Sequence, residues 1–352
     1  MVSLLDLPEE LLCAAFEHLV SENDMNSIAR TNRYLFGLFN PRLYNHNVEY
    51  SDGSALTWAA RYGQQNTARA ILSTMASTNT SQIRIQSRIQ EGLVWAAEGG
   101  HYLIAELLLN QGADLNDGVA LQTASLAGHE SLVKLFIDKG ADVNCPGGGY
   151  GSALQAASCK GHELVMKLLI DNGADVNAQG GAYGSALLAA SQEGHEQSLK
   201  LLIESGADID AQGGIYGNAL QVASWRGYGQ LVELLISHGA DVNSQGGALG
   251  SALQAALIGR HDDLAKLLIN DGADANAQGG ECGNALQVAV INGHKELVKL
   301  LISHGADVNA QGGKFDNALQ AASSRGHEEL VKLLIEHGAD ASNLIERLHI
   351  GS

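Results

Sequence analysis

Hydrophobic and polar positions recur along most of the chain with a period of 33 residues. The stretch from Ser152 to Asn172, "SALQAASCKGHELVMKLLIDN", shows the pattern. Ser152 predicts a helix N-cap, and Gly161 predicts a left-handed residue that ends this first, thin helix. A second helix is predicted by an apolar stripe at helical spacing, made of Leu164, Val165, Leu168 and Leu169. Each unit therefore reads as helix, turn, helix and loop.

Two short sequence tags mark the period. Gly-Ala-Asp begins at Gly140, Gly173, Gly206, Gly239, Gly272, Gly305 and Gly338. Ser/Asn-Ala-Leu ends at Leu154, Leu187, Leu220, Leu253, Leu286 and Leu319. One such unit cannot bury its apolar face alone, so the period predicts a stack of helical units in which each covers the next.

The unit resembles the ankyrin repeat, whose usual pattern is TPLHLAA, then GH, a Leu-rich helix and GADVN. Here the opening reads SALQAAS or NALQVAS, so Ala153 replaces the proline and Gln155 stands at the histidine position. The family histidine forms a hydrogen bond across the turn, and a glutamine amide can do the same. The loop text AQGGxYG is similar to that of long ankyrin arrays of filamentous fungi.

The resemblance implies an all-α ankyrin solenoid of about nine units over residues 51–340. Irregular units are expected at 51–111, a short unit at 117–140 and regular units at 150–340. Residues 341–352 are expected to form a C-terminal cap or tail.

The segment Ser73–Glu91 is polar and longer than an ankyrin loop requires. It fits an extended finger or a longer helix. The alternative is a flexible contact segment whose Arg84 and Arg88 meet an acidic partner.

Residues 1–50 lack the repeat and predict three short helices. Pro8 suits the first turn of a helix, Asp24 can cap the second, and the third stops before Pro41. One apolar face comprises Leu11, Leu12, Ala15, Phe16 and Leu19. Three such helices form a unit too small to be stable without a partner.

This N-terminal segment resembles an F-box. The matching residues are Leu7, Pro8, Glu10, Leu11 and Leu12, then Asp24, Met25 and Ile28, and finally Arg33, Leu43 and Tyr44. The family's usual cysteine and tryptophan are replaced by "ARTNRYL". The resemblance implies that Leu7, Pro8, Glu10, Leu11, Leu12, Leu43 and Tyr44 bind a Skp-type adaptor and, through it, a cullin–RING ubiquitin ligase. The ankyrin array would then hold a substrate protein, and the chain itself would perform no chemistry.

The alternative is that the N-terminal helices only shield the first ankyrin unit, as the ends of repeat arrays require. The protein would then be an ankyrin scaffold or adaptor with no link to ubiquitin.

The formal net charge of −18 argues against nucleic-acid binding, which needs a basic surface, and against docking on anionic membranes. The longest apolar runs are too short to span a bilayer, and the N-terminus lacks a secretory signal pattern. The four cysteines, Cys13, Cys145, Cys159 and Cys282, are scattered. These features suggest the cytoplasm or nucleus.

No pattern indicates an enzyme, a metal or a cofactor. The histidines His129, His162, His195, His294 and His327 each follow a helix-ending glycine. Equivalent positions in stacked helices lie about 10 Å apart, whereas zinc ligands lie about 2 Å from one point. These histidines are therefore interpreted as turn and capping residues. Trp58 and Trp95 occupy a position that is apolar in the repeat and are expected in the core.

Two positions vary most between units: the loop tip and the end of the first helix. In ankyrin proteins both line the concave face, and exposed aromatic and arginine side chains are typical of binding hot spots. The candidate partner-binding residues are Tyr150, Tyr183, Tyr216, Trp225, Arg226, Tyr228 and Phe315. For the tip tyrosines, packing on the neighbouring loop is an equally good interpretation.

Overall fold

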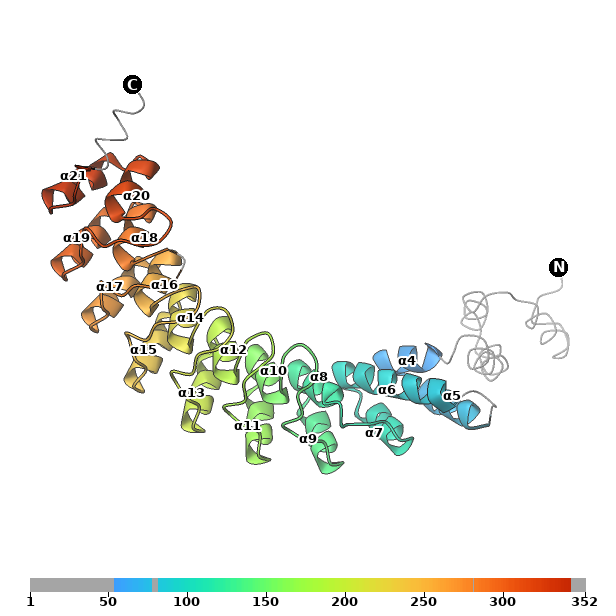
Figure 1. The fold of residues 1–352 in the computed structure, drawn as a ribbon. Helices are drawn as coiled ribbons and strands as arrows, with labels where there is room; N and C mark the ends of the chain where they lie inside the picture. Colours follow the sequence, from blue (N-terminus) through green and yellow to red (C-terminus); the bar gives the residue numbers. More distant parts are fainter. Residues whose placement is uncertain (1–53, 78–81, 281, 343–352) are drawn as a thin grey trace, which may run out of the picture. The chain divides into compact units, whose positions relative to one another are not determined.

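The computed structural model describes residues 54–77, 82–280 and 282–342. Within these residues the regular secondary structure is entirely α-helical, and the eighteen helices form nine consecutive pairs. The expected all-α stack of helix pairs is confirmed (Figure 1). The chain divides into two compact bodies between Cys145 and Pro146.

The described part of the N-terminal body contains three helix pairs. They are α4 (Ser54–Arg61) with α5 (Gln65–Ser77), α6 (Gln82–Gly99) with α7 (Tyr102–Asn110), and α8 (Val119–Ala127) with α9 (Glu130–Asp138).

The C-terminal body contains six pairs of nearly constant length. The first helices are α10 (Ala153–Lys160), α12 (Ala186–Glu193), α14 (Ala219–Arg226), α16 (Ala252–Ile258), α18 (Ala285–Asn292) and α20 (Ala318–Arg325). The second helices are α11 (Glu163–Asp171), α13 (Glu196–Glu204), α15 (Gly229–Ser237), α17 (Asp262–Asn270), α19 (Lys295–Ser303) and α21 (Glu328–Glu336). The first helices form one layer and the second helices the other.

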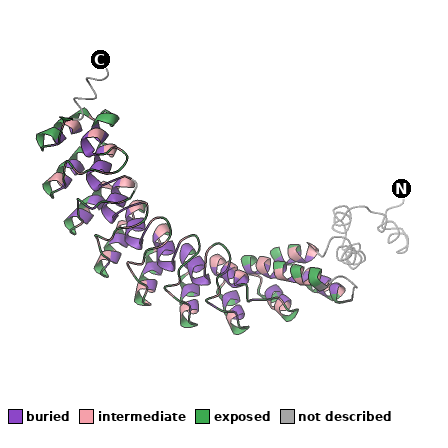
Figure 2. Cartoon of the chain, viewed as in Figure 1, coloured by how far each residue is buried: buried purple, intermediate pink, exposed green. Residues whose placement is uncertain are grey.

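The first helices are thin and almost completely buried (Figure 2). In α10 every residue from Ala153 to Cys159 is buried. Small side chains allow neighbouring first helices to approach closely, and their contacts are more extensive than those between second helices. Five of the six first helices of this body end at a left-handed glycine, as α10 does at Gly161 with a φ of 70°, and α16 is the exception.

The second helices bury one apolar stripe, and its register in α11 differs by one position from the prediction. Val165, Met166 and Leu169 are buried, whereas Leu164 is 69% exposed. The reason is the repeat itself, because the Leu164 position is occupied by polar Gln197, Gln230 and Glu296 in other repeats. Leu164 therefore lies on the solvent face of its helix.

The described residues of the polar segment 73–91 belong to two helices, the end of α5 and the first half of α6. Helix α6 has 18 residues, and Ile89 within it is buried. The Gln90 side chain accepts a hydrogen bond from the Asp114 amide and donates one to its carbonyl, both at 2.8 Å. Arg88 pairs with Glu91 of the same helix at 2.6 Å. The structure supports the longer-helix interpretation for the described residues of this segment.

The loops of the C-terminal body form tight hairpins that stack on one another. Gly180 donates a hydrogen bond to the Gly184 carbonyl at 2.8 Å, and the Ala182 amide donates to Gly149 of the preceding loop at 3.0 Å. A Cβ at Gly181 would overlap the backbone of Tyr150, and its φ is 64°. Glycine is required there because two backbones meet at that point.

Candidate functional site

A buried glutamine ties each first helix to the following loop and so positions the loop tip. In α10, Ser152 and Gln155 form a reciprocal capping box. The Gln155 Nε2 group also lies 3.1–3.2 Å from the carbonyl oxygens of Ala178, Gly180 and Gly184. The glutamine thus makes the cross-turn hydrogen bond expected of it. The same bond to the next loop recurs at Gln221, Gln254 and Gln287, and Leu188 interrupts the series in α12.

An asparagine ladder links successive loops near their bases. The Asn177 side chain donates to the Gly206 carbonyl at 3.1 Å and accepts from the Asp208 amide at 2.8 Å. Asn243, Asn276 and Asn309 make the same two bonds to the next repeat. Asp210 occupies the ladder position between Asn177 and Asn243, and its carboxylate accepts from the Asp241 amide but cannot donate.

The histidines of the turns connect repeats instead of capping helices. Their backbones hold the N-cap position of the second helix, but no side-chain cap forms there. Instead the Nε2 atoms of His129, His195, His261 and His327 lie 3.0–3.4 Å from carbonyl oxygens of the preceding repeat. The predicted turn and N-cap positions are correct, but the side chains form no cap hydrogen bond, because the ring reaches back across the stack.

Tyr228 takes the histidine position in the turn before α15. A Cβ added to Gly194 would lie 2.9 Å from the Tyr228 ring, so the ring covers the glycine of the preceding repeat. Tyr228 is half-buried there, and packing between repeats accounts for its contact.

Arg260 breaks the glycine series in the turn after α16. It adopts φ 62°, the left-handed conformation that glycine provides in the other turns. His294 of the next repeat departs from its histidine neighbours, since its Nδ1 lies 2.6 Å from Asp262 Oδ1. The Arg260 Cβ explains the change, because a Cβ at the equivalent Gly161 or Gly227 would overlap the following histidine ring.

The loop-tip tyrosines pack against each other and remain half-buried. The rings of Tyr150 and Tyr183 stack with centroids 6.2 Å apart. The Tyr183 hydroxyl accepts from the Cys159 thiol at 3.3 Å and donates to Glu193 at 3.0 Å. Burial, followed by these two hydrogen-bond partners, raises the pKa of Tyr183, so the hydroxyl keeps the proton that it donates. For Tyr150 and Tyr183 the loop-packing interpretation describes the contacts observed.

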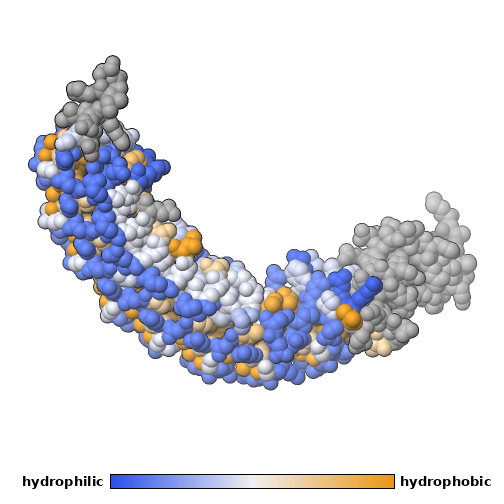
Figure 3. Space-filling model, in the orientation of Figure 1, coloured by the Kyte–Doolittle hydropathy of each residue, from blue (hydrophilic) through white to orange (hydrophobic). Residues whose placement is uncertain are grey.

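Tyr216 instead forms a cluster with the end of α14, which we call the Trp225 cluster: Ile215, Tyr216, Trp225 and Arg226. The Tyr216 and Trp225 rings stack at 5.0 Å, and the Arg226 guanidinium lies 4.7 Å from the Trp225 ring centroid. Ile215 is 68% exposed beside them. Hydrophobic surface is visible on the loops in this part of the C-terminal body (Figure 3). The cluster is preassembled and still open to solvent.

The same pairing recurs at the last loop tip, where Arg325 lies 5.7 Å from the Phe315 ring centroid. In both cases the arginine follows the loop-tip aromatic by ten residues, as Tyr216 and Arg226 show. The ten-residue spacing can be read from the sequence. Only the structure shows that the two side chains pack against each other. Leu249, at the equivalent tip of another repeat, is 5% exposed and belongs to the core.

Trp58 and Trp95 do not lie in the core, and the prediction for them is wrong. Trp58 is 44% exposed and contacts Tyr62 at 5.4 Å between ring centroids. Arg61 lies 4.3 Å from the centroid of the half-buried Trp95 ring. In the C-terminal body the equivalent position carries small residues such as Ala156, which is fully buried between first helices. An indole is too large for that space and turns outward.

Two of the cysteine thiols within the described residues, those of Cys145 and Cys159, act as hydrogen-bond donors. Cys145 donates to the Asn116 carbonyl at 3.0 Å, and burial, followed by Asp142 and Asp117, raises its pKa. No group of three His, Cys, Asp or Glu side chains in the described ranges could hold a metal ion. None of the helices described is long and apolar enough to cross a membrane.

The predicted adaptor-binding residues Leu7, Pro8, Glu10, Leu11, Leu12, Leu43 and Tyr44 lie outside the described residues.

A family model for three consecutive ankyrin repeats matches the chain in overlapping segments, at residues 93–180, 121–213, 154–246, 220–312 and 252–345. A search of curated proteins finds no match. Together the matched segments cover well over half of the chain, and ankyrin repeats point to a role in protein–protein interaction. The helix pairs, the left-handed glycines and the stacked hairpins agree with this match, and the chain belongs to the ankyrin-repeat family.

Proposed function

We propose that this protein is the substrate-receptor subunit of a Skp–cullin–F-box ubiquitin ligase. Residues 1–50 form the F-box-like domain that binds the Skp-type adaptor, and the adaptor brings the cullin. The ankyrin array at 51–340 binds the substrate protein, and residues 341–352 form the tail. The chain supplies binding and positioning rather than chemistry, and it works in the cytoplasm or nucleus.

The observation that carries the substrate-binding half is the Trp225 cluster. Trp225 occupies a position filled by Cys159, Gln192 and Ser324 in other repeats, so the fold does not require an aromatic residue there. The Tyr216 ring stacks on the indole at 5.0 Å, and the Arg226 guanidinium lies 4.7 Å from its centroid, so both contacts fix the indole. A ring that is already fixed loses little conformational entropy when a partner binds, which favours affinity. Tryptophan, tyrosine and arginine are also the residues most enriched in binding hot spots.

The adaptor-binding half rests on the sequence. Leu7, Pro8 and Glu10 match the F-box opening, and the segment predicts a three-helix unit too small to be stable alone. An isolated cap for the array needs only one helix with a polar outer face, so three helices favour a unit with its own partner.

Co-purification of the full chain with a purified Skp-type adaptor tests the proposal. Replacing both Leu7 and Pro8 by Ala should abolish co-purification and leave the far-UV circular dichroism of the array unchanged. Trp225→Ala is the matched control, because it should retain the adaptor. If the wild-type chain does not bind the adaptor, the protein is an ankyrin scaffold without a link to ubiquitin.

A further inference from the structure

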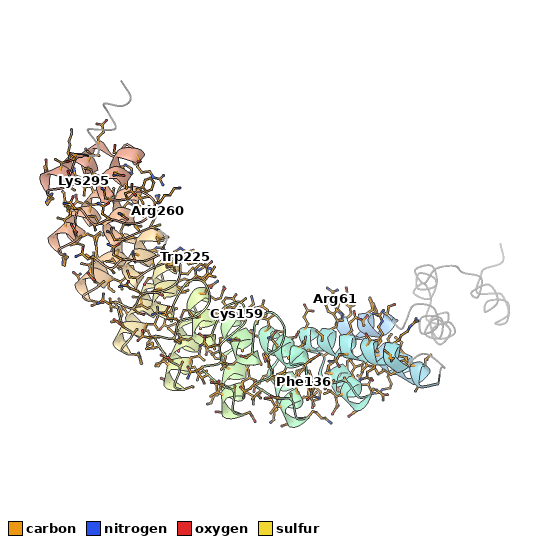
Figure 4. The ribbon with its side chains drawn as sticks, in the orientation of Figure 1. Arg61, Phe136, Cys159, Trp225, Arg260 and Lys295 are labelled. Carbon is orange, nitrogen blue, oxygen red and sulfur yellow. The ribbon has the colours of Figure 1, made fainter. Side chains whose placement is uncertain are left out.

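Basic side chains lie on both layers of the C-terminal body, and those on the first-helix side gather at the helix ends. Exposed cations occupy the last turn of three first helices or the turn that follows one: Lys160, Arg226, Arg260 and Arg325. We call these four residues the basic row. Figure 4 labels Trp225 and Arg260 on the first-helix side and Lys295 on the second-helix side.

The two layers also differ in how their cations are neutralised. Four of the six lysines on the second helices, Lys200, Lys266, Lys295 and Lys299, each lie within 4 Å of a carboxylate of the described residues, whereas Lys167 and Lys332 do not. The Lys295–Glu329 pair lowers the pKa of Glu329. No such ion pair forms at any residue of the basic row within the described part of the chain. The single carboxylate at an equivalent helix end, Glu193, accepts the Tyr183 hydroxyl.

Helix dipoles do not account for the basic row. A cation at a helix C-terminus interacts favourably with the helix dipole. Yet α12 ends in Glu193, and α16 and α18 end in the uncharged Ile258 and Asn292. Arg260 lies beyond the helix in a left-handed conformation that is unfavourable for a non-glycine residue. Backbone strain of this kind is often retained for function.

We infer that the partner held by the array is an extended acidic segment with a large apolar residue near its middle. Its carboxylates would pair with the basic row, and the apolar residue would pack on the Trp225 cluster, where Ile215 is the exposed apolar group. The guanidinium of Arg226 lies over the Trp225 ring and keeps its N–H edge for a carboxylate. This inference rests on the proposed function in one respect: both assume that the partner binds the side of the array formed by the first helices.

The repeat spacing sets the pattern of acidic residues. Neighbouring helices lie about 8–10 Å apart, and an extended chain advances about 3.3 Å per residue. Carboxylates that meet Arg226 and Arg260, in adjacent repeats, should therefore be about three residues apart. Lys160 and Arg226 are two repeats apart, so the corresponding carboxylates should be separated by about six residues.

The chain's net charge of −18 does not oppose this binding. Exposed charges are screened beyond about 8 Å at physiological salt, so a segment in contact with the basic row responds mainly to the local charges. The same net charge disfavours nucleic acid, whose long charged backbone would extend past the basic row.

Selection from a display library of random 16-residue peptides against the full-length protein tests the inference. Selected sequences should be rich in Asp and Glu with the spacing above and should carry one large apolar residue. Binding should weaken about tenfold or more in an Arg226→Glu/Arg260→Glu variant and when salt is raised from 0.05 to 0.5 M. The matched control, Lys167→Glu/Lys332→Glu, makes the same change in net charge on second helices and should alter affinity less than twofold.

Three outcomes would overturn the inference: selected peptides that are neutral or basic, no selected peptide at all, or equal binding by the two charge variants. Tighter binding of a 15-nucleotide single-stranded DNA than of any acidic peptide would also overturn it. None of these outcomes affects adaptor binding by residues 1–50, so failure here is distinguishable from failure of the proposed function.

Discussion

The interruption of the asparagine ladder at Asp210 predicts a stabilising substitution. Asn177 and Asn243 each donate to a glycine carbonyl of the next repeat and accept an amide from it. Asp210 accepts the Asp241 amide at 3.0 Å but has no proton for the Gly239 carbonyl. Asp210→Asn should add that hydrogen bond without moving the backbone, because neighbouring repeats already accommodate asparagine.

The expected gain follows from the bonds made and lost. A net hydrogen bond contributes about 0.5–1.5 kcal/mol, and this exposed one belongs near the lower end. The asparagine amide oxygen accepts the Asp241 amide less strongly than the carboxylate does. This difference lowers the expected gain in stability by a few tenths of a kcal/mol. Removing a negative charge between Asp208 and Asp241 raises the stability, because it reduces the repulsion between these carboxylates. We expect the free energy of unfolding to rise by about 0.5–1 kcal/mol.

Denaturant unfolding at 0.05 and 0.5 M sodium chloride provides the assay. The repulsion between charges is screened at the higher salt, so a gain that persists there comes from the hydrogen bond. Asn243→Asp is the matched control, because it creates the same defect one repeat later and should destabilise by a similar amount. A loss of stability in Asp210→Asn, a gain confined to low salt, or an Asn243→Asp variant as stable as wild type would refute the reasoning.

Three further predictions separate structural from binding roles. Gln221→Leu should lower stability by about 2 kcal/mol, because buried carbonyls of the next loop lose their hydrogen-bond donor. Hydrogen exchange in the hairpin at 246–250 should then accelerate, and an unchanged exchange rate would contradict this role of Gln221. Trp58→Ala should cost under about 1 kcal/mol, as expected of an exposed side chain, whereas Leu56→Ala should cost about 2–5 kcal/mol; similar losses measured by thermal melting would place Trp58 in the core after all. Trp225→Ala should weaken capture of an identified substrate by about 2 kcal/mol, or roughly thirtyfold, with little change in melting temperature, and wild-type capture by this variant would place the binding centre elsewhere.

Much of the candidate site could be predicted because each residue can be compared with the residues at the equivalent position of the other repeats. A residue that differs from its equivalents, as Trp225 does, stands out against positions that only have to build the stack. The polar residues at the positions equivalent to Leu164 likewise indicate that this position faces solvent. The comparison between repeats could not distinguish Tyr150 and Tyr183, which stack on each other, from Tyr216, which stacks on a tryptophan. Those choices depend on ring contacts between residues of different loops and helices.

The sequence by itself determined the helix pairs, their glycine ends and the glutamine link between repeats, because these depend on local conformation and on spacing that recurs every 33 residues. Tertiary structure alone decided what lies between repeats. The space left by small residues such as Ala156 is too narrow for an indole, so Trp58 turns outward. The Arg260 Cβ takes the place of a histidine ring, so His294 pairs with Asp262. The orientation of Trp58 and the pairing of His294 are both set by the space available between neighbouring repeats. That space depends on three-dimensional packing and cannot be read from the sequence pattern.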